Sequence, residues 1–268
     1  MKYFSFLLSL LLVSCSTIKI KDISPDYTQE VVGKIKMMDI KKYEYKFNKK
    51  DTVNLVKTII VHFDKDQKLI SEKIFTEEGS KESNFKYSNG LILEKEVISA
   101  NDTAVITFKY DNQENIIEEI SADRNGIFNI TNQTFDKYHN PIEIKKNFYN
   151  KIRHSTSNDY NYKKKFLISK SIIDTIAKKE VITKRYFDKN GFILKTENLN
   201  SNTNSKYYTH VIDKEGNLLS KTYHDGNGTI IETVTFKNTY DTAGNIKTRE
   251  RFLNNKLIDK TIYINTYY

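Results

Sequence analysis

The stretch Thr239-Tyr240-Asp241-Thr242-Ala243-Gly244-Asn245-Ile246-Lys247-Thr248-Arg249 contains the pattern that decides how the chain folds. An aromatic residue is followed by Asp, then by a Gly-Asn pair, and then by an apolar residue that opens a new alternating run. Asp tolerates turn geometry and can bond its own backbone, while Gly supplies the positive φ angle of a tight turn. The stretch therefore predicts a β-hairpin in which the aromatic residue closes the first strand.

The same pattern recurs along almost the whole chain. Shorter versions have an anchor residue, usually followed by Asp, at Phe63, Tyr87, Tyr110, Phe135, Tyr162, Phe187, Ile212 and Tyr240. Successive anchors are 23 to 28 residues apart, and the copies at Tyr87 and Tyr162 lack the Asp. Because self-similarity at a fixed period marks repeat architectures, we read eight units of about 25 residues, each with two strands and two turns.

The pattern Tyr-Asp-x-x-Gly-x-apolar resembles the YD repeats of RHS-type bacterial cell-surface proteins. Residues Tyr240–Ile246 match it best, and Phe187–Ile193 follow closely. The likeness covers roughly residues 60–255 and implies an array of β-hairpins. The long toxin-enclosing shells of that family need many more repeats and carry a variable C-terminal effector. Neither the shell nor a toxin is therefore carried over to this chain.

The N-terminus has the features of an export signal. Met1-Lys2 is a short basic start, and Tyr3 to Val13 is an apolar run of secretory length. Leu12-Val13-Ser14-Cys15 resembles the lipobox of bacterial lipoproteins, which implies cleavage before Cys15 and a diacylglycerol on its thiol. A plain anchor helix is the alternative, but the run is too short for a span of about 20 residues. We predict a signal peptide over residues 1–14 and lipidation (palmitate included) at Cys15.

Residues 15–30 read as a polar tether, and residues 31–268 as one β-hairpin repeat domain without a further linker. Lys19 and Lys21 could touch anionic lipid headgroups, although a merely solvated linker is the preferred reading. Ser16 follows the Cys, where Asp retains enteric lipoproteins in the inner membrane. The resemblance therefore implies anchoring in the cell envelope, at the outer membrane if the organism uses that rule.

The composition bounds the fold class. Hydrophobic residues make up 38% of the chain and charged residues 29%, with 18 Tyr, 15 Phe and no Trp. This suits antiparallel strands with one aromatic-rich packed face and one solvated face. Eight units imply roughly 16 to 18 strands, and an open sheet rarely exceeds about 10 without curling or splitting. We predict an all-β antiparallel meander in one long, strongly curled sheet, with solenoid-like, half-barrel and sandwich forms left open.

One segment competes with this all-β reading. Ile168 to Ile182 is the best helical candidate in the sequence. Asp174 and Thr175 in its middle instead favour a hairpin turn between two apolar runs. We therefore expect two strands here.

No constellation in the sequence specifies a reaction. The five histidines, His62, His139, His154, His210 and His224, fall in different units without metal-ligand spacing. Asp225 to Ile230 faintly resembles a calcium loop, but Gly at position six and Glu at position twelve are missing, so a hairpin turn is expected. The sequence has no G-x-S-x-G elbow, Cys–His pair or phosphate-cradling loop. We predict no catalytic residue, no metal and no cofactor.

The predicted function follows from the export signal and the repeats. A net charge of +9 indicates solubility and weak attraction to anionic surfaces, and an exported protein rarely meets nucleic acid. We predict a non-catalytic, lipid-anchored envelope protein that presents its repeat domain to a protein or glycan partner. A carrier of lipid or another hydrophobic ligand in a cavity of the sheet is the alternative. A hydrolase with a site assembled from distant strands is a weaker one, and the oligomeric state is left open.

Overall fold

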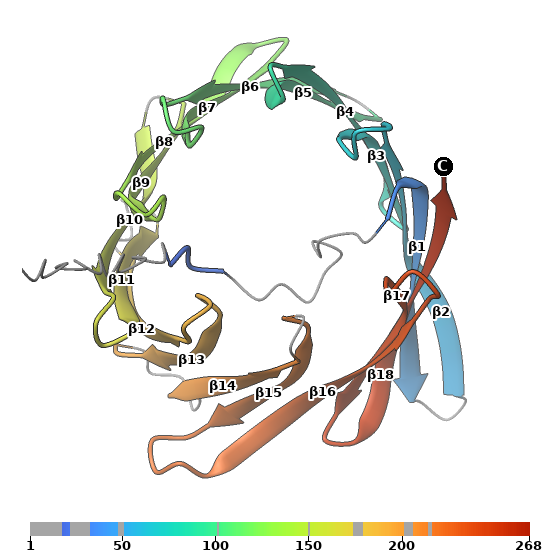
Figure 1. The fold of residues 1–268 in the computed structure, drawn as a ribbon, viewed down its shortest axis with the longest axis vertical. Helices are drawn as coiled ribbons and strands as arrows, with labels where there is room; N and C mark the ends of the chain where they lie inside the picture. Colours follow the sequence, from blue (N-terminus) through green and yellow to red (C-terminus); the bar gives the residue numbers. More distant parts are fainter. Residues whose placement is uncertain are drawn as a thin grey trace, which may run out of the picture.

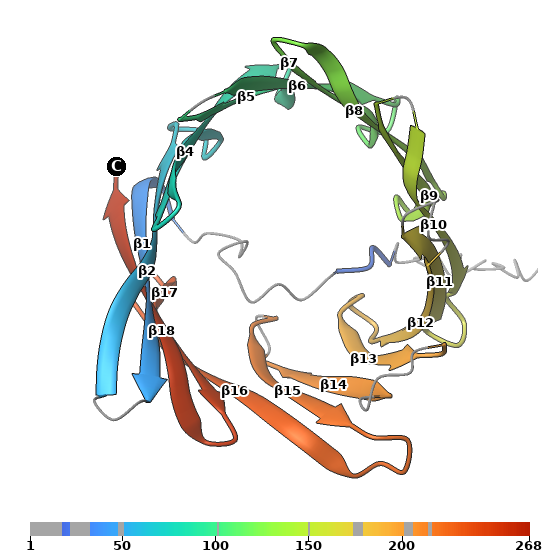
Figure 2. The same cartoon turned by 180° about the vertical axis from the view of Figure 1, so that it is seen from behind.

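The strands of the chain close into a ring. The computed structural model describes residues 18–21, 33–47, 51–100, 102–149, 151–173, 179–200, 206–213 and 216–268. In these residues one antiparallel sheet of 18 strands pairs each strand with the next along the chain. The first strand, β1 (Ile35–Phe47), also pairs with the last, β18 (Lys256–Tyr267), so the sheet forms a closed barrel (Figure 1). Figure 2 shows the same ring from behind.

The strands between these two differ in length. They are β2 (Asp51–Phe63), β3 (Leu69–Thr76), β4 (Gly79–Ser88), β5 (Leu91–Ser99), β6 (Thr103–Tyr110), β7 (Ile116–Asp123), β8 (Gly126–Phe135), β9 (Pro141–Phe148), β10 (Lys151–Asn161), β11 (Phe166–Ile173), β12 (Lys179–Phe187), β13 (Ile193–Asn198), β14 (Tyr207–Ile212), β15 (Leu218–His224), β16 (Ile230–Tyr240) and β17 (Ile246–Leu253). Within the described residues there is no helix with the length and hydrophobicity of a transmembrane span.

The closure corrects part of the predicted fold. The all-β antiparallel meander in a strongly curled sheet is confirmed, whereas the solenoid-like, half-barrel and sandwich forms are wrong. β1 and β18 pair from Ile35 opposite Tyr267 to Glu44 opposite Asp259, with one register shift between Ile35 and Met37. Closing the sheet removes both edges, which would otherwise present unpaired N–H and C=O groups. The sequence pattern could not show this pairing because its partners lie at opposite ends of the chain.

The described residues of the ambiguous segment Ile168 to Ile182 form strands and not a helix. β11 ends at Ile173, and β12 begins at Lys179 and pairs with it antiparallel. The prediction of two strands is therefore confirmed. The predicted turn at Asp174-Thr175 lies outside the described residues.

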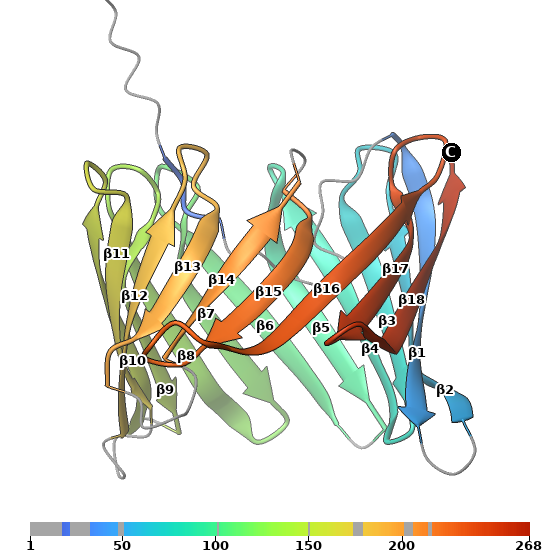
Figure 3. The same ribbon diagram turned by 90° about the horizontal axis from the view of Figure 1, so that it is seen from below.

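The repeat period places all eight anchors at one end of the barrel. Antiparallel strands alternate in direction, so a step of two strands returns the chain to the same rim. The anchors are the last residues of β2, β6, β8, β12, β14 and β16, and Tyr87 and Tyr162 lie next to the last residues of β4 and β10. We call this end the anchor rim; the start of β1 and the end of β18 lie there too (Figure 3).

Asp carboxylates build the turns of the anchor rim. In the turn after β16, Asp241 Oδ1 accepts hydrogen bonds from the backbone N–H groups of Ala243 at 3.0 Å and Asn245 at 2.9 Å. Gly244 in this turn has a φ of +93°, a conformation that favours glycine. The turns that begin at Asp64, Asp111, Asp136 and Asp188 repeat the two Oδ1 bonds. The predicted turn chemistry is confirmed.

The second carboxylate oxygen links a turn to the next unit. The Tyr267 hydroxyl donates to Asp241 Oδ2 at 2.5 Å, and the Tyr240 hydroxyl donates to Asp213 Oδ2 at 3.2 Å. Asn245 Nδ2 also donates to the Tyr267 hydroxyl, at 2.9 Å. Among the anchor tyrosines, Tyr240 and Tyr162 each bond the Asp of the preceding unit, whereas the hydroxyls of Tyr87 and Tyr110 donate to backbone carbonyl oxygens.

Side chains complete the ring where the two chain ends meet. The Tyr268 hydroxyl of the C-terminus donates to the carbonyl oxygen of Phe63 at 2.6 Å. Gln67 Nε2 donates to the carbonyl oxygen of Ile35 at 3.1 Å, and Gln67 Oε1 accepts from the Ile35 N–H at 2.8 Å. A buried apolar cluster lies behind these contacts; it comprises Ile35, Met38, Ile40, Ile59, Val61, Ile246 and Tyr263.

The hairpin turn at Asp225 provides a control for the tyrosine link. Asp225 Oδ1 accepts from the N–H groups of Asn227 and Thr229, both at 2.8 Å, so the turn reading of this stretch is confirmed. The turn connects β15 to β16 and lies at the opposite rim. The Asp225 turn thus has the same backbone hydrogen bonds as the Asp241 turn, but it lies at the rim that lacks the anchors.

We predict that Asp241→Ala lowers the free energy of unfolding by about 1 kcal/mol, allowing for solvent exposure, and more than Asp225→Ala does. Asp241 loses both the turn bonds and the Tyr267 link. Burial opposes ionisation of Asp241, but bonds from Tyr267, Asn265 and the backbone outweigh it and hold its pKa below the ordinary value. A lowered pKa stabilises the fold above the ordinary carboxyl pKa and loses this effect as pH falls through the folded pKa.

Urea unfolding of the two variants and the parent at several pH values measures these differences. The gap between the parent and Asp241→Ala should shrink in acid. Equal destabilisation by the two substitutions at neutral pH would show that the Tyr267 link contributes nothing.

Candidate binding site on the inner wall

One face of the sheet lines the inside of the ring. The segment Ile18–Lys21 lies within the ring beside β10 and β11 in both end-on views (Figures 1 and 2). Ile20 lines a cavity of about 340 Å³ together with His154, Thr156 and Tyr160 of β10. Because side chains alternate across a strand, these even-numbered residues of β10 mark its inward face. The pairing registers then carry this assignment from strand to strand around the barrel.

A second cavity, of about 370 Å³, lies against the inward face of β12 to β17. Its basic lining residues are Arg185, His210, Lys221 and Arg251, and its aromatic ones are Tyr208, Tyr223 and Phe236. Threonines and aliphatic side chains complete the lining: Thr183, Thr196, Ile193, Leu218 and Val234. Among the described residues that line this cavity there is no carboxylate. We call it the basic cavity.

The basic side chains of this cavity are held by neighbours. Lys221 Nζ lies 4.0 Å from the ring centre of Tyr208 and 4.8 Å from that of Tyr223, within the range of cation–π attraction. His210 Nδ1 lies 3.0 Å from the carbonyl oxygen of Ile193, so Nδ1 carries a hydrogen and donates it. These contacts position the two groups before any ligand arrives.

Arg251 sits beside an acidic group just outside the lining. Arg251 Nη2 is 2.5 Å from Asp259 Oδ2, and Lys42 Nζ is 3.9 Å from the same oxygen. Burial raises the pKa of the Asp259 carboxyl, and the positive charges of Arg251 and Lys42 offset only part of this effect. Asp259 therefore orients the Arg251 guanidinium at the edge of the cavity.

The lining is suited to binding an anion that carries a ring or an apolar body. Guanidinium and ammonium groups pair with carboxylates and phosphates, and tyrosine faces accept flat or apolar groups. The cavity volume falls within the range of small-ligand sites, which combine an apolar lining with a few placed polar groups. The pair of carboxylates that a glycosidase needs is not present among its described lining residues.

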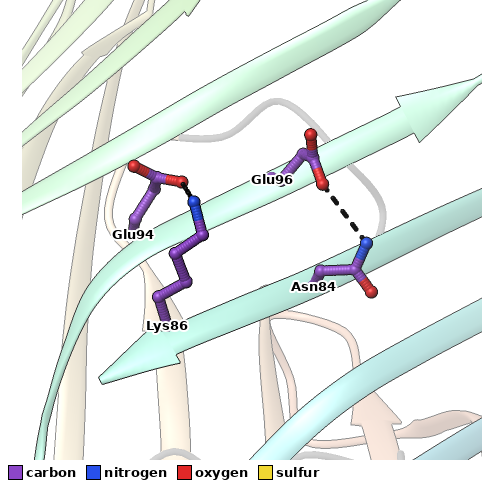
Figure 4. Close-up of polar contacts among 4 residues, drawn as sticks. All are labelled: Asn84, Lys86, Glu94 and Glu96. Atoms are coloured by element: carbon purple, nitrogen blue, oxygen red, sulfur yellow. Dashed lines mark hydrogen bonds and ion pairs between the residues drawn. The ribbon is translucent and has the colours of Figure 1, made fainter.

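The outer wall carries ion pairs. Lys86 Nζ lies 2.6 Å from Glu94 Oε1, and Asn84 Nδ2 donates to Glu96 Oε2 at 3.3 Å. Figure 4 shows both pairs on the outward side of β4 and β5. Similar pairs follow around the ring: Lys73–Glu82, Lys109–Glu118, Lys170–Glu180 and Lys260–Glu250. On a lipid-facing barrel wall, which is apolar over about 25 Å, a midplane Lys costs about 2–4 kcal/mol.

Two turns of the anchor rim hold the segment Ile18–Lys21, which we call the strap. Asn140 is 1% exposed; its Oδ1 accepts from the Ile20 N–H at 2.8 Å, and its Nδ2 donates to the Ile18 carbonyl oxygen at 2.9 Å. The Lys21 N–H donates to the carbonyl oxygen of Gly191 at 2.8 Å. Four residues of the predicted tether are thus bound to the barrel, which the sequence did not indicate.

Gly191 is required at the strap contact. It has a φ of +86°, and a Cβ built on it would lie 2.0 Å from the backbone oxygen of Lys19. Gly244 occupies the matching place in its own turn, with a φ of +93°, and a Cβ there would meet no atom within 4 Å. The two glycines therefore share backbone strain but differ in strap contact.

We predict that Gly191→Ala displaces the strap and that Gly244→Ala does not. Amide hydrogen exchange at Lys21 measures this directly, because its N–H is bonded to Gly191. Exchange at Lys21 should accelerate at least tenfold in Gly191→Ala only, since loss of one hydrogen bond worth about 1.4 kcal/mol opens that amide tenfold more often. Unchanged protection in Gly191→Ala would contradict the close contact.

The structure separates the residues that the sequence singled out. Cys15, the predicted lipidation site, lies outside the described residues. His139 Nδ1 is 3.0 Å from Asn115 Oδ1, and the His224 ring stacks on Tyr207 with centres 4.5 Å apart. Within the described residues no three His, Cys, Asp or Glu side chains form a group that could hold a metal.

Sequence reasoning missed the basic cavity. Its residues come from six strands that only the barrel brings together. A signal did exist, because Tyr208 with His210 and Lys221 with Tyr223 each place an aromatic and a basic residue two positions apart, on one face of a strand. These pairs resembled ordinary packing positions in the sequence.

No protein-family model and no curated protein matches the sequence. A porin-like protein from Bacteroides uniformis is similar in structure, with 10% identity, a TM-score of 0.49 and coverage of 88% of this chain and 98% of that one. The Photorhabdus luminescens Tc holotoxin pore is similar with 11% identity, a TM-score of 0.30 and coverage of 84% of this chain and 15% of that one. A putative outer membrane lipoprotein-sorting domain from Vibrio parahaemolyticus is similar with 8% identity, a TM-score of 0.29 and coverage of 89% of this chain and 87% of that one. Membership of the YD-repeat family stays a prediction.

Proposed function

We propose that this chain is a non-catalytic, lipid-anchored envelope protein whose barrel binds an acidic glycan in the basic cavity. The observation that carries the proposal is the lining itself, in which Arg185, Lys221 and Arg251 line the same cavity as the tyrosines and Lys221 lies over the rings of Tyr208 and Tyr223. Acidic sugars combine a carboxylate with a ring that stacks on an aromatic face, so both parts of the lining have a partner.

The outer wall supports an aqueous setting for this barrel. Its ion pairs, such as Lys86 with Glu94, favour water on the outside. Membrane attachment then depends on Cys15, where two or three acyl chains give stable anchoring that one chain does not. Ser16 favours the outer membrane for this anchor, by the rule known from enteric lipoproteins.

We predict that Lys221→Ala weakens binding of a polygalacturonate oligosaccharide about tenfold, because one charge-assisted contact is worth about 1.4 kcal/mol. The matched control is Lys86→Ala, which removes an exposed lysine from the outer wall. Isothermal titration against the acidic oligosaccharide and a neutral one of equal length measures both effects. Equal affinity for the two oligosaccharides, or equal loss in both variants, would reject the acidic-glycan assignment.

A second candidate is a carrier of a hydrophobic ligand in the same cavity. Ile193, Leu218, Val234 and Phe236 give the lining an apolar part that suits an acyl chain. Binding of a fluorescent fatty acid, with the acidic oligosaccharide as competitor, separates the two candidates. A carrier would bind the fatty acid, and the oligosaccharide, which a carrier does not bind, would fail to displace it.

We predict that the protein incorporates radiolabelled palmitate in cells and that Cys15→Ala abolishes the label. Cys15 is the single Cys of the chain, so no other thiol can take the lipid. Protease treatment of intact cells in the same experiment reports which side of the membrane the barrel faces. Retained label in Cys15→Ala would exclude the lipobox assignment.

A further inference from the structure

Exposed lysines gather around the strap. Lys19 and Lys21 belong to the strap itself, and Lys137, Lys163 to Lys165 and Lys189 lie on three successive turns of the anchor rim. All seven are exposed. The turns are 136–140, 162–165 and 188–192, and two of them bind the strap through Asn140 and Gly191. One sector of one rim therefore carries a dense positive charge.

Two carboxylates, Asp136 and Asp188, lie in these turns, so the strap and the three turns together keep a formal charge of +5, from seven lysines and two aspartates. Asp136 accepts hydrogen bonds from the N–H groups of Tyr138 and Asn140 and from the Tyr162 hydroxyl. Asp188 accepts from the N–H groups of Asn190 and Phe192 in the same way. Within the described part of the chain none of the seven lysines forms an ion pair, whereas the outer-wall lysines pair with glutamates.

The strap also fixes where a lipid anchor would emerge. Ile18 is bound at the rim by Asn140 and is three residues beyond Cys15. Three extended residues reach about 10 Å at most. An acylated Cys15 would therefore hold this sector close to the headgroups, with the seven lysines between the barrel and the bilayer.

We propose that this sector of the anchor rim docks on an anionic phospholipid surface, so that the barrel stands with its anchor rim towards the membrane. The partner follows from the charge, since clustered lysines near a bilayer are attracted to acidic headgroups. The standing orientation rests on the lipid anchor of the proposed function. The attraction of the lysines to anionic lipid does not, and it can be measured without the anchor.

The test compares two lysine triplets of equal charge. Every strand lies after residue 34, so the chain from residue 15 onward with Cys15→Ser keeps the whole sheet and the strap. Lys163→Glu, Lys164→Glu and Lys165→Glu together reverse the side-chain charge at three positions of the docking sector. Lys151→Glu, Lys179→Glu and Lys256→Glu together make the same change on exposed residues at the starts of β10, β12 and β18, on the opposite rim.

Flotation with phosphatidylcholine vesicles, with and without phosphatidylglycerol, measures binding. We expect the parent to bind only the anionic vesicles, the rim triplet to lose at least tenfold in affinity, and the opposite-rim triplet to lose less than threefold. Circular dichroism should show both variants folded. Equal loss in both triplets, or no preference of the parent for anionic vesicles, would overturn the proposal.

A second measurement separates the docking surface from the anchor. The full chain is expressed with its signal, recovered in vesicles and treated with an amine-acetylating reagent. Lys163 to Lys165 and Lys189 should be at least threefold less modified than Lys151 and Lys179. A failed palmitate label with intact flotation would reject the anchor alone, and successful labelling with no rim protection would reject the docking orientation alone.

Discussion

The joining of neighbouring turns at the anchor rim depends on the use of both oxygens of one carboxylate. In the Asp241 turn, Oδ1 holds the backbone of its own hairpin, while Oδ2 accepts the hydroxyl of Tyr267 from the next unit. A single hairpin is marginal in water, and each hairpin here is also paired with its neighbours along its strands. Because Tyr162, Tyr240 and Tyr267 each donate to the Asp of the preceding unit, the hairpins in these parts of the barrel are bonded at the rim as well as along their strands. Local turn chemistry therefore also joins neighbouring units.

Closure of the ring converts this local order into two different surfaces. Once β1 pairs with β18, every strand has two neighbours, and the alternation of side chains separates an inside from an outside. Glutamate–lysine pairs such as Lys86–Glu94 fall outside. Inside, Lys221 lies over the rings of Tyr208 and Tyr223. A sequence of modest hydrophobicity can form a stable barrel in this way because neither face has to be wholly apolar.

Much of the local structure was predictable, and the parts that depend on closure were not. The Asp and Gly residues of the turns, and the strands on either side of residues 174–178, are local features that propensity reveals. The pairing of Ile40 with Tyr263 spans the chain and leaves no periodic signal. Lys221 and Arg251 line the same cavity only because the curled sheet brings their strands together. The sequence predicts Asn140 as a turn residue, but its hydrogen bonds to the strap involve a segment more than a hundred residues away.

The two ends of the barrel differ because the repeat has a direction. Every anchor, and both termini of the sheet, lie at one rim, where Asn245 and Tyr267 join turn to turn. A rim bonded in this way keeps its curvature, and inward residues near it, such as Ile193 and Leu218 at the starts of β13 and β15, keep their spacing. Binding sites are more precise when rigid elements carry them. Because the basic cavity includes these two residues, the bonding that closes the turns also gives the inner wall a fixed shape.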